Sequence, residues 1–184
     1  MSTIQKVGGW QQLKVDEVYE NPWIKVTHET VKTPNNTDGI YGVVHFKSRA
    51  VGILPIDNKD YTWLVKQSRY TLNEYTWEIP AGGAALDEMP LVAAQRELRE
   101  ETGLSANNWQ TWLRLHLSNS VTDEEAIIYL ATELSTGKME LEATEDIQVR
   151  YLPLQQAIEM VIKGEITDAI SVCALLKASK FLTV

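Results

Sequence analysis

The chain has 184 residues, of which 17 are lysine or arginine and 25 are aspartate or glutamate, so its formal net charge is −8. Hydrophobic residues make up 44% and charged residues 23%, which is typical of a folded domain and excludes a wholly disordered chain. An acidic surface repels the phosphate backbone of nucleic acids, so we expect no long nucleic acid as a partner. A short anionic substrate still binds if a cation bridges it to the protein.

The start of the sequence and its single cysteine favour a cytoplasmic protein. Met1–Trp10 lacks the cationic start and apolar stretch of a signal peptide, and no apolar run is long enough to span a membrane. Cys173 has no second cysteine with which to form an intrachain disulfide, which is typical of a reducing compartment. We therefore expect no membrane partner.

Short strands are predicted for the first half of the chain. Alternating and β-branched stretches are separated by turn signals at Pro34–Gly39 and Asp57–Asp60, which favours hairpins. The expected strands cover residues 23–28, 39–46, 50–56, 61–67 and 75–79.

The pattern becomes helical after an expected loop at Gly82–Gly83. Apolar residues recur at helical spacing over Leu91–Leu98, which predicts one helix with an apolar stripe. Asp87 is expected to be the N-cap, Pro90 is tolerated in the first turn, and Gly103 suits the position that ends a helix.

Further strands and two closing helices are predicted for the rest of the chain. The strands cover residues 109–117, 125–131 and 147–152, and the helices cover residues 154–162 and 167–181. One helix within a strand-rich region and two helices at the end favour the α+β class, with sheet between helices in an α/β/α sandwich.

Charged residues at regular spacing gather between Gly82 and Leu104. Glu97 and Glu101 are four residues apart, so a helix projects their carboxylates together. A hard divalent cation with oxygen ligands offsets the resulting repulsion well. Arg96 and Glu100 have the same spacing on a neighbouring face, where the arginine can hold a carboxylate in place. For such a run in isolation, a solvated helix with ordinary ion pairs is the simpler interpretation.

The complete pattern resembles the Nudix box, G-x5-E-x7-R-E-U-x-E-E-x-G-U, where U is a bulky aliphatic residue. Every defined position is satisfied, by Gly82, Glu88, Arg96, Glu97, Leu98, Glu100, Glu101, Gly103 and Leu104. Residues 67–70 and 78–82 before the box, and residues 145–147 with two helices after it, are similar to those of ADP-ribose pyrophosphatases and related nucleoside diphosphate sugar hydrolases.

The resemblance implies a Nudix fold, with a mixed sheet between helices and the box as a loop–helix–loop. Residues 1–46 would form a strand-rich extension used for dimerisation, and residues 47–184 the hydrolase domain. The implied reaction is hydrolysis of the diphosphate bond of ADP-ribose or a related nucleoside diphosphate sugar, dependent on Mg²⁺ or Mn²⁺. Its products would be a nucleoside monophosphate and a sugar phosphate, and the expected assembly is a homodimer.

The resemblance also implies the metal ligands. These are Glu97 and Glu101 with the backbone carbonyl of Ala81. Glu100 is a further candidate ligand, and Glu100 and Arg96 are candidate catalytic residues. Glu88 and Arg96 would support the loop and orient Glu97.

In this branch the group that assists the attacking water comes from a loop after the box. Glu142 and Glu145 are the candidates, and Glu145 is favoured as general base or further metal ligand. Plain solvation of an acidic loop is the alternative.

Substrate contacts are implied at four positions. Arg69 would pair with a phosphate, and Glu78 would face the metal or the substrate. Trp23 and Tyr41 occupy places from which similar enzymes sandwich the base between aromatic residues of two subunits. Core packing or dimer contacts are the alternative for both rings.

One departure affects the substrate prediction. ADP-ribose hydrolases commonly carry a proline in the loop after the box, but there is none between Leu104 and Pro153. The loop over residues 117–125 is instead polar and acidic, with Glu124 and Glu125 as possible ligands, although solvation is the favoured role for both. Two alternatives therefore stay open. One is a Nudix hydrolase for a dinucleoside polyphosphate, coenzyme A or a nucleoside triphosphate. The other is a non-catalytic nucleotide-sensing module, which the intact box glutamates disfavour.

Overall fold

The computed structural model describes residues 5–139 and 146–180, and the chain divides into two compact units. The N-terminal unit comprises Met1–Ser48 with His116–Glu124, and the core unit comprises Arg49–Leu115 with Glu125–Val184. The division after residue 48 lies near the expected one after residue 46. That His116–Glu124 belongs to the first unit is a long-range feature that no local pattern indicated.

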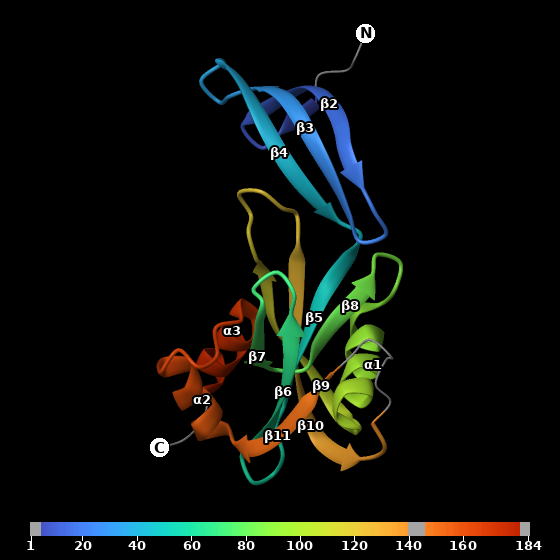
Figure 1. Ribbon diagram of the computed structural model, residues 1–184, viewed down its shortest axis with the longest axis vertical. Helices are drawn as coiled ribbons and strands as arrows, with labels where there is room; N and C mark the ends of the chain where they lie inside the picture. Colours follow the sequence, from blue (N-terminus) through green and yellow to red (C-terminus); the bar gives the residue numbers. More distant parts are fainter. Residues whose placement is uncertain (1–4, 140–145, 181–184) are drawn as a thin grey trace. The chain divides into compact units, whose positions relative to one another are not determined.

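The N-terminal unit is an antiparallel sheet with strand order β1-β2-β3-β4 (Figure 1). Its strands are β1 (Gln5–Val7), β2 (Trp10–Glu20), β3 (Ile24–Lys32) and β4 (Asp38–Phe46). The first two were not predicted individually. No residue of β2 is fully buried, so the strand lacks the in–out hydrophobic alternation by which half-buried strands are recognised.

The segment His116–Glu124 is bound to strand β4. The amide of Val44 donates to the carbonyl of Val121 at 2.8 Å, and that of Phe46 donates to Asp123 Oδ1 at 2.9 Å. His45 Nδ1 lies 2.7 Å from Asp123 Oδ2. These contacts explain why the segment belongs to the N-terminal unit.

The core unit is built on two sheets. One has strand order β8-β5-β10-β9, with β10 parallel to β5, and the other is antiparallel with order β11-β6-β7. The strands of the first are β5 (Ser48–Pro55), β8 (Ala81–Ala85), β9 (Leu104–His116) and β10 (Glu125–Thr136). Those of the second are β6 (Tyr61–Arg69), β7 (Glu74–Glu78) and β11 (Gln148–Pro153).

Within residues 5–139 and 146–180, three helices cover these sheets. Helix α1 (Pro90–Thr102) packs against β8, α2 (Leu154–Ile162) packs against β6 and β11, and α3 (Ala169–Ala178) packs against α2 and β10. Figure 1 shows α1 on one side of the strands and α2 and α3 on the other. The α+β class, with mixed sheet between helices, is therefore confirmed.

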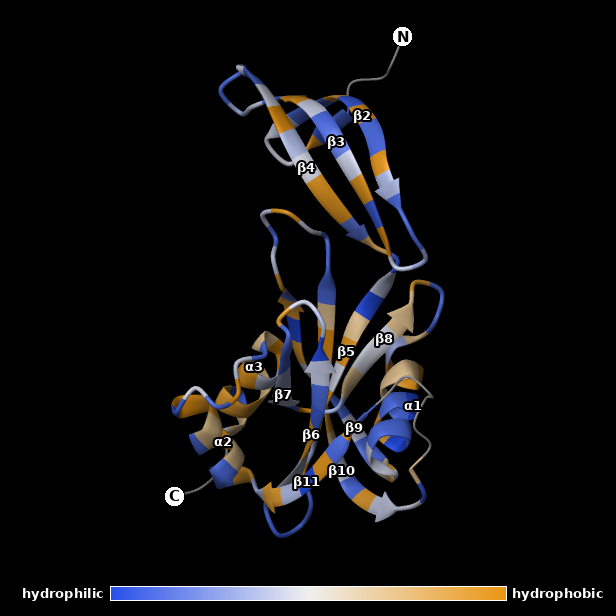
Figure 2. Cartoon of the chain, viewed as in Figure 1, coloured by the Kyte–Doolittle hydropathy of each residue, from blue (hydrophilic) through white to orange (hydrophobic). Residues whose placement is uncertain are grey.

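The core is apolar where α1 meets the first sheet. Val51, Ile53, Leu98 and Ile127 belong to one buried cluster, together with small residues of α1 such as Ala94. In Figure 2, α1 is largely hydrophilic along the side in view, whereas α2 and α3 carry many apolar residues. Across residues 5–139 and 146–180, no helix is both long and apolar enough to cross a lipid bilayer.

Two local predictions around the box were wrong. Gly82–Gly83 is part of strand β8 rather than of a loop, because pairing beside β5 supplies backbone hydrogen bonds that local composition does not reveal. The N-cap of α1 is Met89 rather than Asp87. Pro90 disfavours a helical conformation at the residue before it and is itself favoured at the first helical position, so the helix begins there. Gly103 ends the helix as expected, with φ of 71°.

Candidate active site

Helix α1 and strand β8 bring two buried carboxylates to one stretch of backbone. Glu101 is 1% exposed, and its Oε2 accepts a hydrogen bond from the amide of Ala81 at 2.9 Å. Glu97 is 8% exposed and lies against Gly82. Two carboxylates one helical turn apart therefore converge on Ala81–Gly82, although burying such charges is unfavourable without compensating partners.

Gly82 makes this convergence possible. A Cβ built on Gly82 would lie 2.0 Å from Cδ of Glu97 and 2.2 Å from its Oε1. Any side chain at position 82 would therefore displace the Glu97 carboxylate. The glycine at the first position of the motif is required by this close approach.

Arg96 holds the charged residues of the box in place. Its Nη1 donates to Glu97 Oε1 at 2.7 Å and to Glu100 Oε2 at 3.0 Å, and its Nη2 donates to the carbonyl of Gly83 at 3.0 Å. Glu88 lies 3.7 Å from the same guanidinium. Burial lowers the pKa of Arg96, but the attraction of Glu97 and the bonds to Glu97 and Glu100 outweigh that effect and raise it. Arg96 is thus a permanent cation among carboxylates.

This donor set fits a divalent metal ion. Among the residues that the structure describes, no three His, Cys, Asp or Glu side chains are grouped closely enough to hold a metal by themselves. Mg²⁺ does not need such a cage, because it usually keeps several waters and is bound through one or two carboxylates and the phosphates of a substrate. Glu97 and Glu101, which both approach the Ala81–Gly82 backbone, match that requirement.

A second cluster lies on strands β6 and β7. Arg69 Nε donates to Glu78 Oε1 at 2.8 Å, and Arg69 Nη2 donates to Glu78 Oε2, so the pair is bidentate. Thr76 Oγ1 donates to the same Glu78 Oε1. The hydrogen bonds to Glu78 raise the pKa of Arg69 against the opposing effect of burial, and the charges of Asp168 and Glu101 raise it further. Arg69 therefore lies within electrostatic reach of the box.

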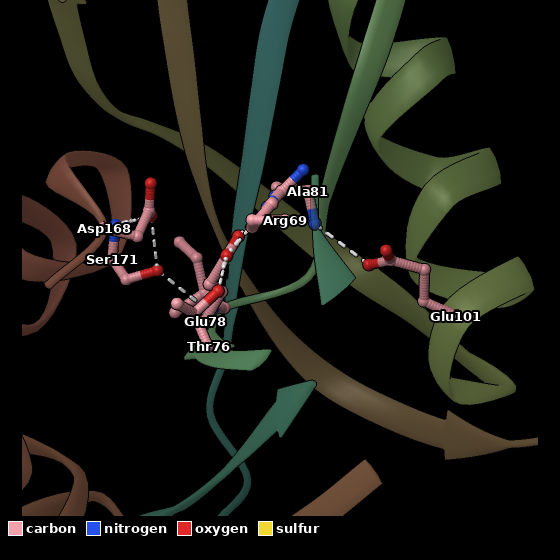
Figure 3. A network of polar contacts seen from close by, with 8 residues as sticks. Arg69, Thr76, Glu78, Ala81, Glu101, Asp168 and Ser171 are labelled. Carbon is pink, nitrogen blue, oxygen red and sulfur yellow. Dashed lines mark hydrogen bonds and ion pairs between the residues drawn. The ribbon is translucent and has the colours of Figure 1, made fainter. Parts of the chain in front are cut away.

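Helix α3 is tied to the short segment between β7 and β8 that leads into the box (Figure 3). Ser171 Oγ accepts a hydrogen bond from the amide of Ile79 at 2.9 Å and donates to Asp168 Oδ2 at 2.7 Å. Asp168 is the N-cap of α3 and also accepts from the amide of Ser171 at 2.8 Å. Sequence reasoning missed Thr76, Asp168 and Ser171. Aspartate is a favoured N-cap residue, so its place near the start of the last expected helix is a signal that could have found Asp168, but nothing local links it to Ile79.

The other predicted site residues lie elsewhere. Trp23 and Tyr41 belong to the N-terminal unit, where Trp23 is 70% exposed. The hydroxyl of Tyr41 donates to the carbonyl of Ser120 at 2.8 Å. Glu142 and Glu145 lie outside the described residues.

The two glutamates of the loop after the box, Glu124 and Glu125, also have defined surroundings. Glu124 belongs to the N-terminal unit, and burial raises its pKa. Glu125 is paired with Arg114 and with Arg49, whose Nε lies 3.6 Å from Glu125 Oε2. These ion pairs give Glu125 a local partner other than a metal.

Comparison with known families identifies the class. A model of the NUDIX domain matches residues 46–173, and a model of the nucleoside diphosphate sugar hydrolase N-terminal domain matches residues 10–44. The chain therefore belongs to the Nudix family, which confirms the class of enzyme expected from the motif.

Individual relatives agree with this assignment. The chain is 37% identical over 139 residues to an ADP-ribose pyrophosphatase of Mycobacterium tuberculosis, a match that spans 73% of this chain and 65% of that protein. It is 31% identical over 156 residues to an ADP-ribose pyrophosphatase of Bacillus subtilis, with 84% of each covered. The crystal structure of an ADP compounds hydrolase matches 99% of this chain and 97% of its own, with a TM-score of 0.84 and 23% identity, which shows the shared fold.

Proposed function

We propose that this chain hydrolyses the diphosphate bond of ADP-ribose or a related nucleoside diphosphate sugar in the presence of Mg²⁺ or Mn²⁺. The products are a nucleoside monophosphate and a sugar phosphate. One observation carries the proposal: Glu97 and Glu101 converge on Ala81–Gly82, with Arg69 within electrostatic reach. The names of the two relatives, both ADP-ribose pyrophosphatases, support the choice of substrate.

Each residue has a separate task in this proposal. Glu97 and Glu101 hold the cation with the carbonyl of Ala81, and Arg96 keeps Glu97 oriented. Glu100, which Arg96 binds, serves as an additional ligand. The cation supplies neutralisation of the diphosphate oxygens and a lowered pKa for a coordinated water.

Arg69 and Glu145 act on the substrate and on the water. Arg69 pairs with a phosphate, since a guanidinium matches phosphate geometry with two parallel hydrogen bonds. Glu78, which accepts two hydrogen bonds from Arg69, keeps the guanidinium in one orientation. Glu145 accepts the proton of the attacking water, with Glu142 as the second candidate for this step. A Glu145→Gln variant is expected to lose about 10²- to 10⁴-fold in kcat, the usual contribution of a general base.

The N-terminal unit serves a homodimer in this proposal. Val18 on β2 is 64% exposed, Ile40 on β4 71%, and Trp23 in the turn between β2 and β3 70%, which is high exposure for large apolar side chains in one small unit. We expect a second copy to cover them, and Trp23 to stack on the nucleobase, with Tyr41 as its counterpart. Sedimentation showing a monomer at micromolar concentration would contradict the dimer.

A substrate panel tests the proposal. The protein is incubated with Mg²⁺ and ADP-ribose, other nucleoside diphosphate sugars, dinucleoside polyphosphates, coenzyme A and nucleoside triphosphates, and nucleoside monophosphate release is measured. We expect the highest kcat/KM for a nucleoside diphosphate sugar. A preference for another member of the panel would favour the alternative Nudix substrates, and no turnover at all would favour a nucleotide-sensing module.

Variants of the box test the metal assignment. Glu101→Gln should lower kcat by at least about 100-fold, because it removes a buried carboxylate from the metal site. Glu100→Gln should cost less, because Arg96 already neutralises Glu100. Equal losses in both variants would place Glu100 on equal terms with Glu101 as a ligand, and full activity of Glu101→Gln would contradict the site.

A further inference from the structure

A small pocket lies beside Arg69, outside the Nudix box and within the core unit. Its volume is about 180 Å³, and its polar lining consists of Arg69, Thr71, Thr76, Glu78, Thr167 and Asp168. Pockets for complete small-molecule ligands usually measure about 300–1,000 Å³. At roughly 30 Å³ for each water molecule, this one holds about six waters. It is therefore of a size for one chemical group of a larger substrate, such as a single sugar ring.

The charged residues that line the pocket determine which chemical group of a substrate can bind there. Arg69 contributes one positive charge, whereas Glu78 and Asp168 contribute two negative charges. Because Glu78 already neutralises Arg69 through the bidentate pair, the remaining uncompensated charge is that of Asp168. A carboxylate repels a phosphate but accepts hydrogen bonds from hydroxyl groups. A neutral polyol such as a sugar suits this lining, and an additional phosphate does not.

One carboxylate oxygen of Asp168 accepts the hydrogen bonds that cap the start of helix α3. Its Oδ2 accepts from both the amide and the hydroxyl of Ser171, at 2.8 and 2.7 Å. Its Oδ1 makes no hydrogen bond to any residue within the described ranges 5–139 and 146–180. The N-cap geometry therefore fixes the carboxylate of this pocket-lining residue, while its second oxygen stays available as an acceptor.

The pocket is placed next to the proposed diphosphate site. Figure 3 shows the Arg69–Glu78 pair between Asp168 on one side and Glu101 on the other. The charges of Asp168 and Glu101 both raise the pKa of Arg69, as expected for carboxylates in the neighbourhood of the same guanidinium. A diphosphate bound between Arg69 and the box would thus direct one of its two substituents toward the pocket.

We propose that this pocket is the subsite for the sugar on the far side of the diphosphate, and that Asp168 determines specificity by accepting a hydrogen bond from a sugar hydroxyl. This inference rests on the proposed function and narrows it. A compound with a third phosphate in place of the sugar is disfavoured because that phosphate meets the charge of Asp168. Nucleoside diphosphate sugars are therefore preferred over nucleoside triphosphates.

ADP-ribose and ATP provide a matched pair of probes, since both contain ADP and differ in the group attached to its second phosphate. The kcat/KM for ADP-ribose and the inhibition constant of ATP are measured with Mg²⁺ for the wild type and for Asp168→Asn. Asparagine is as good an N-cap as aspartate, so the helix start is retained. Glu165→Gln, an exposed charge loss three residues away that does not line the pocket, is the control.

We expect Asp168→Asn to lower kcat/KM for ADP-ribose by about ten- to hundredfold, the range for one hydrogen bond to a charged group, mainly through KM. The same variant should bind ATP more tightly, and Glu165→Gln should change neither value. A purely structural role would weaken both ligands in proportion, and that result would overturn the subsite.

A second variant tests the subsite in case Asp168→Asn does not fold. Thr167→Val changes an exposed lining residue and should lower kcat/KM for ADP-ribose severalfold without weakening ATP. An unchanged kcat/KM in Thr167→Val together with a misfolded Asp168→Asn would also overturn the subsite. A wild type that is inactive on every compound of the substrate panel would overturn the proposed function and the subsite together, so the two failures are distinguishable.

Discussion

The carboxylate of Glu97 occupies the space in which any side chain at position 82 would begin, because a Cβ on Gly82 would lie 2.0 Å from Glu97 Cδ. The two residues come from different elements, the strand β8 and the helix α1. Their contact couples the backbone of the strand to the position of a proposed metal ligand. The glycine is thus a requirement of the site rather than of a turn.

Substitution of this glycine should therefore affect activity strongly. Gly82→Ala is expected to lower kcat by about 100-fold, the upper end of the losses seen when support of a metal ligand is removed, and to raise the Mg²⁺ concentration needed for half-maximal activity. Gly42→Ala is the control, because a Cβ there meets nothing within 4 Å. Steady-state kinetics over a Mg²⁺ series make the measurement. Similar activity in the two variants would contradict the Gly82–Glu97 relationship.

A conservative change at Arg69 should separate binding from chemistry. Lysine keeps the charge but cannot form the bidentate pair that Arg69 makes with Glu78, nor the matching fork to a phosphate. We expect Arg69→Lys to raise KM for the diphosphate substrate about tenfold, with a smaller change in kcat. Arg150→Lys, which alters an arginine above the ring of Trp77, serves as the control. If KM stays at the wild-type value, Arg69 is not a substrate ligand.

Loss of the Ser171 hydroxyl should be a stability defect. Ser171 is fully buried and is the acceptor for the amide of Ile79 across 92 residues of sequence. A buried donor without a partner costs about 1–3 kcal/mol, so Ser171→Ala should lower the free energy of unfolding by that amount. Chemical denaturation measures it. Ser105→Ala, at an exposed position in β9, should stay within about 0.5 kcal/mol of the wild type.

The pair of Tyr151 and Asp57 should give a pH-dependent contribution to stability. The hydroxyl of Tyr151 donates to Asp57 Oδ2 at 2.6 Å, and this bond, with burial and the Asp57 charge, raises the pKa of Tyr151 to about 12. Burial raises the pKa of Asp57, but the hydrogen bonds from Tyr151 and from the amides of Tyr61 and Lys59 outweigh it and lower that pKa.

The direction of the pH effect follows from these two shifts. A raised tyrosine pKa gives a stabilisation that is complete below the unfolded value of about 10 and is lost as the pH rises through about 12. The lowered Asp57 pKa gives a stabilisation that is present above about pH 4 and is lost as the pH falls through the folded value. The difference in Tm between wild type and Tyr151→Phe should thus be constant near neutrality and vanish toward pH 12. For Tyr70→Phe, at a 96% exposed position, no difference is expected at any pH.

Local patterns were sufficient for most of the secondary structure of the core. Strand β6 and helix α2 follow their predicted ranges because hydrophobic periodicity and turn residues act over a few neighbouring positions. The same locality explains the failures. Whether Gly82 lies in a loop or a strand depends on β5, which is distant in sequence, and β2 has no buried residue to produce a pattern.

The sequence by itself determined the chemistry of the box: the spacing of Glu97 and Glu101 on a helix, and the presence of Arg96 beside them, are local facts. Only the tertiary structure decided what surrounds them. It placed Glu97 against Gly82, paired Glu78 with Arg69, and bound Ser171, itself hydrogen-bonded to Asp168, to the segment between β7 and β8 that enters the box. Such contacts join residues far apart in sequence. Whether they form depends on how whole elements pack together. The hydrophobic periodicity of a single segment carries no information about that packing.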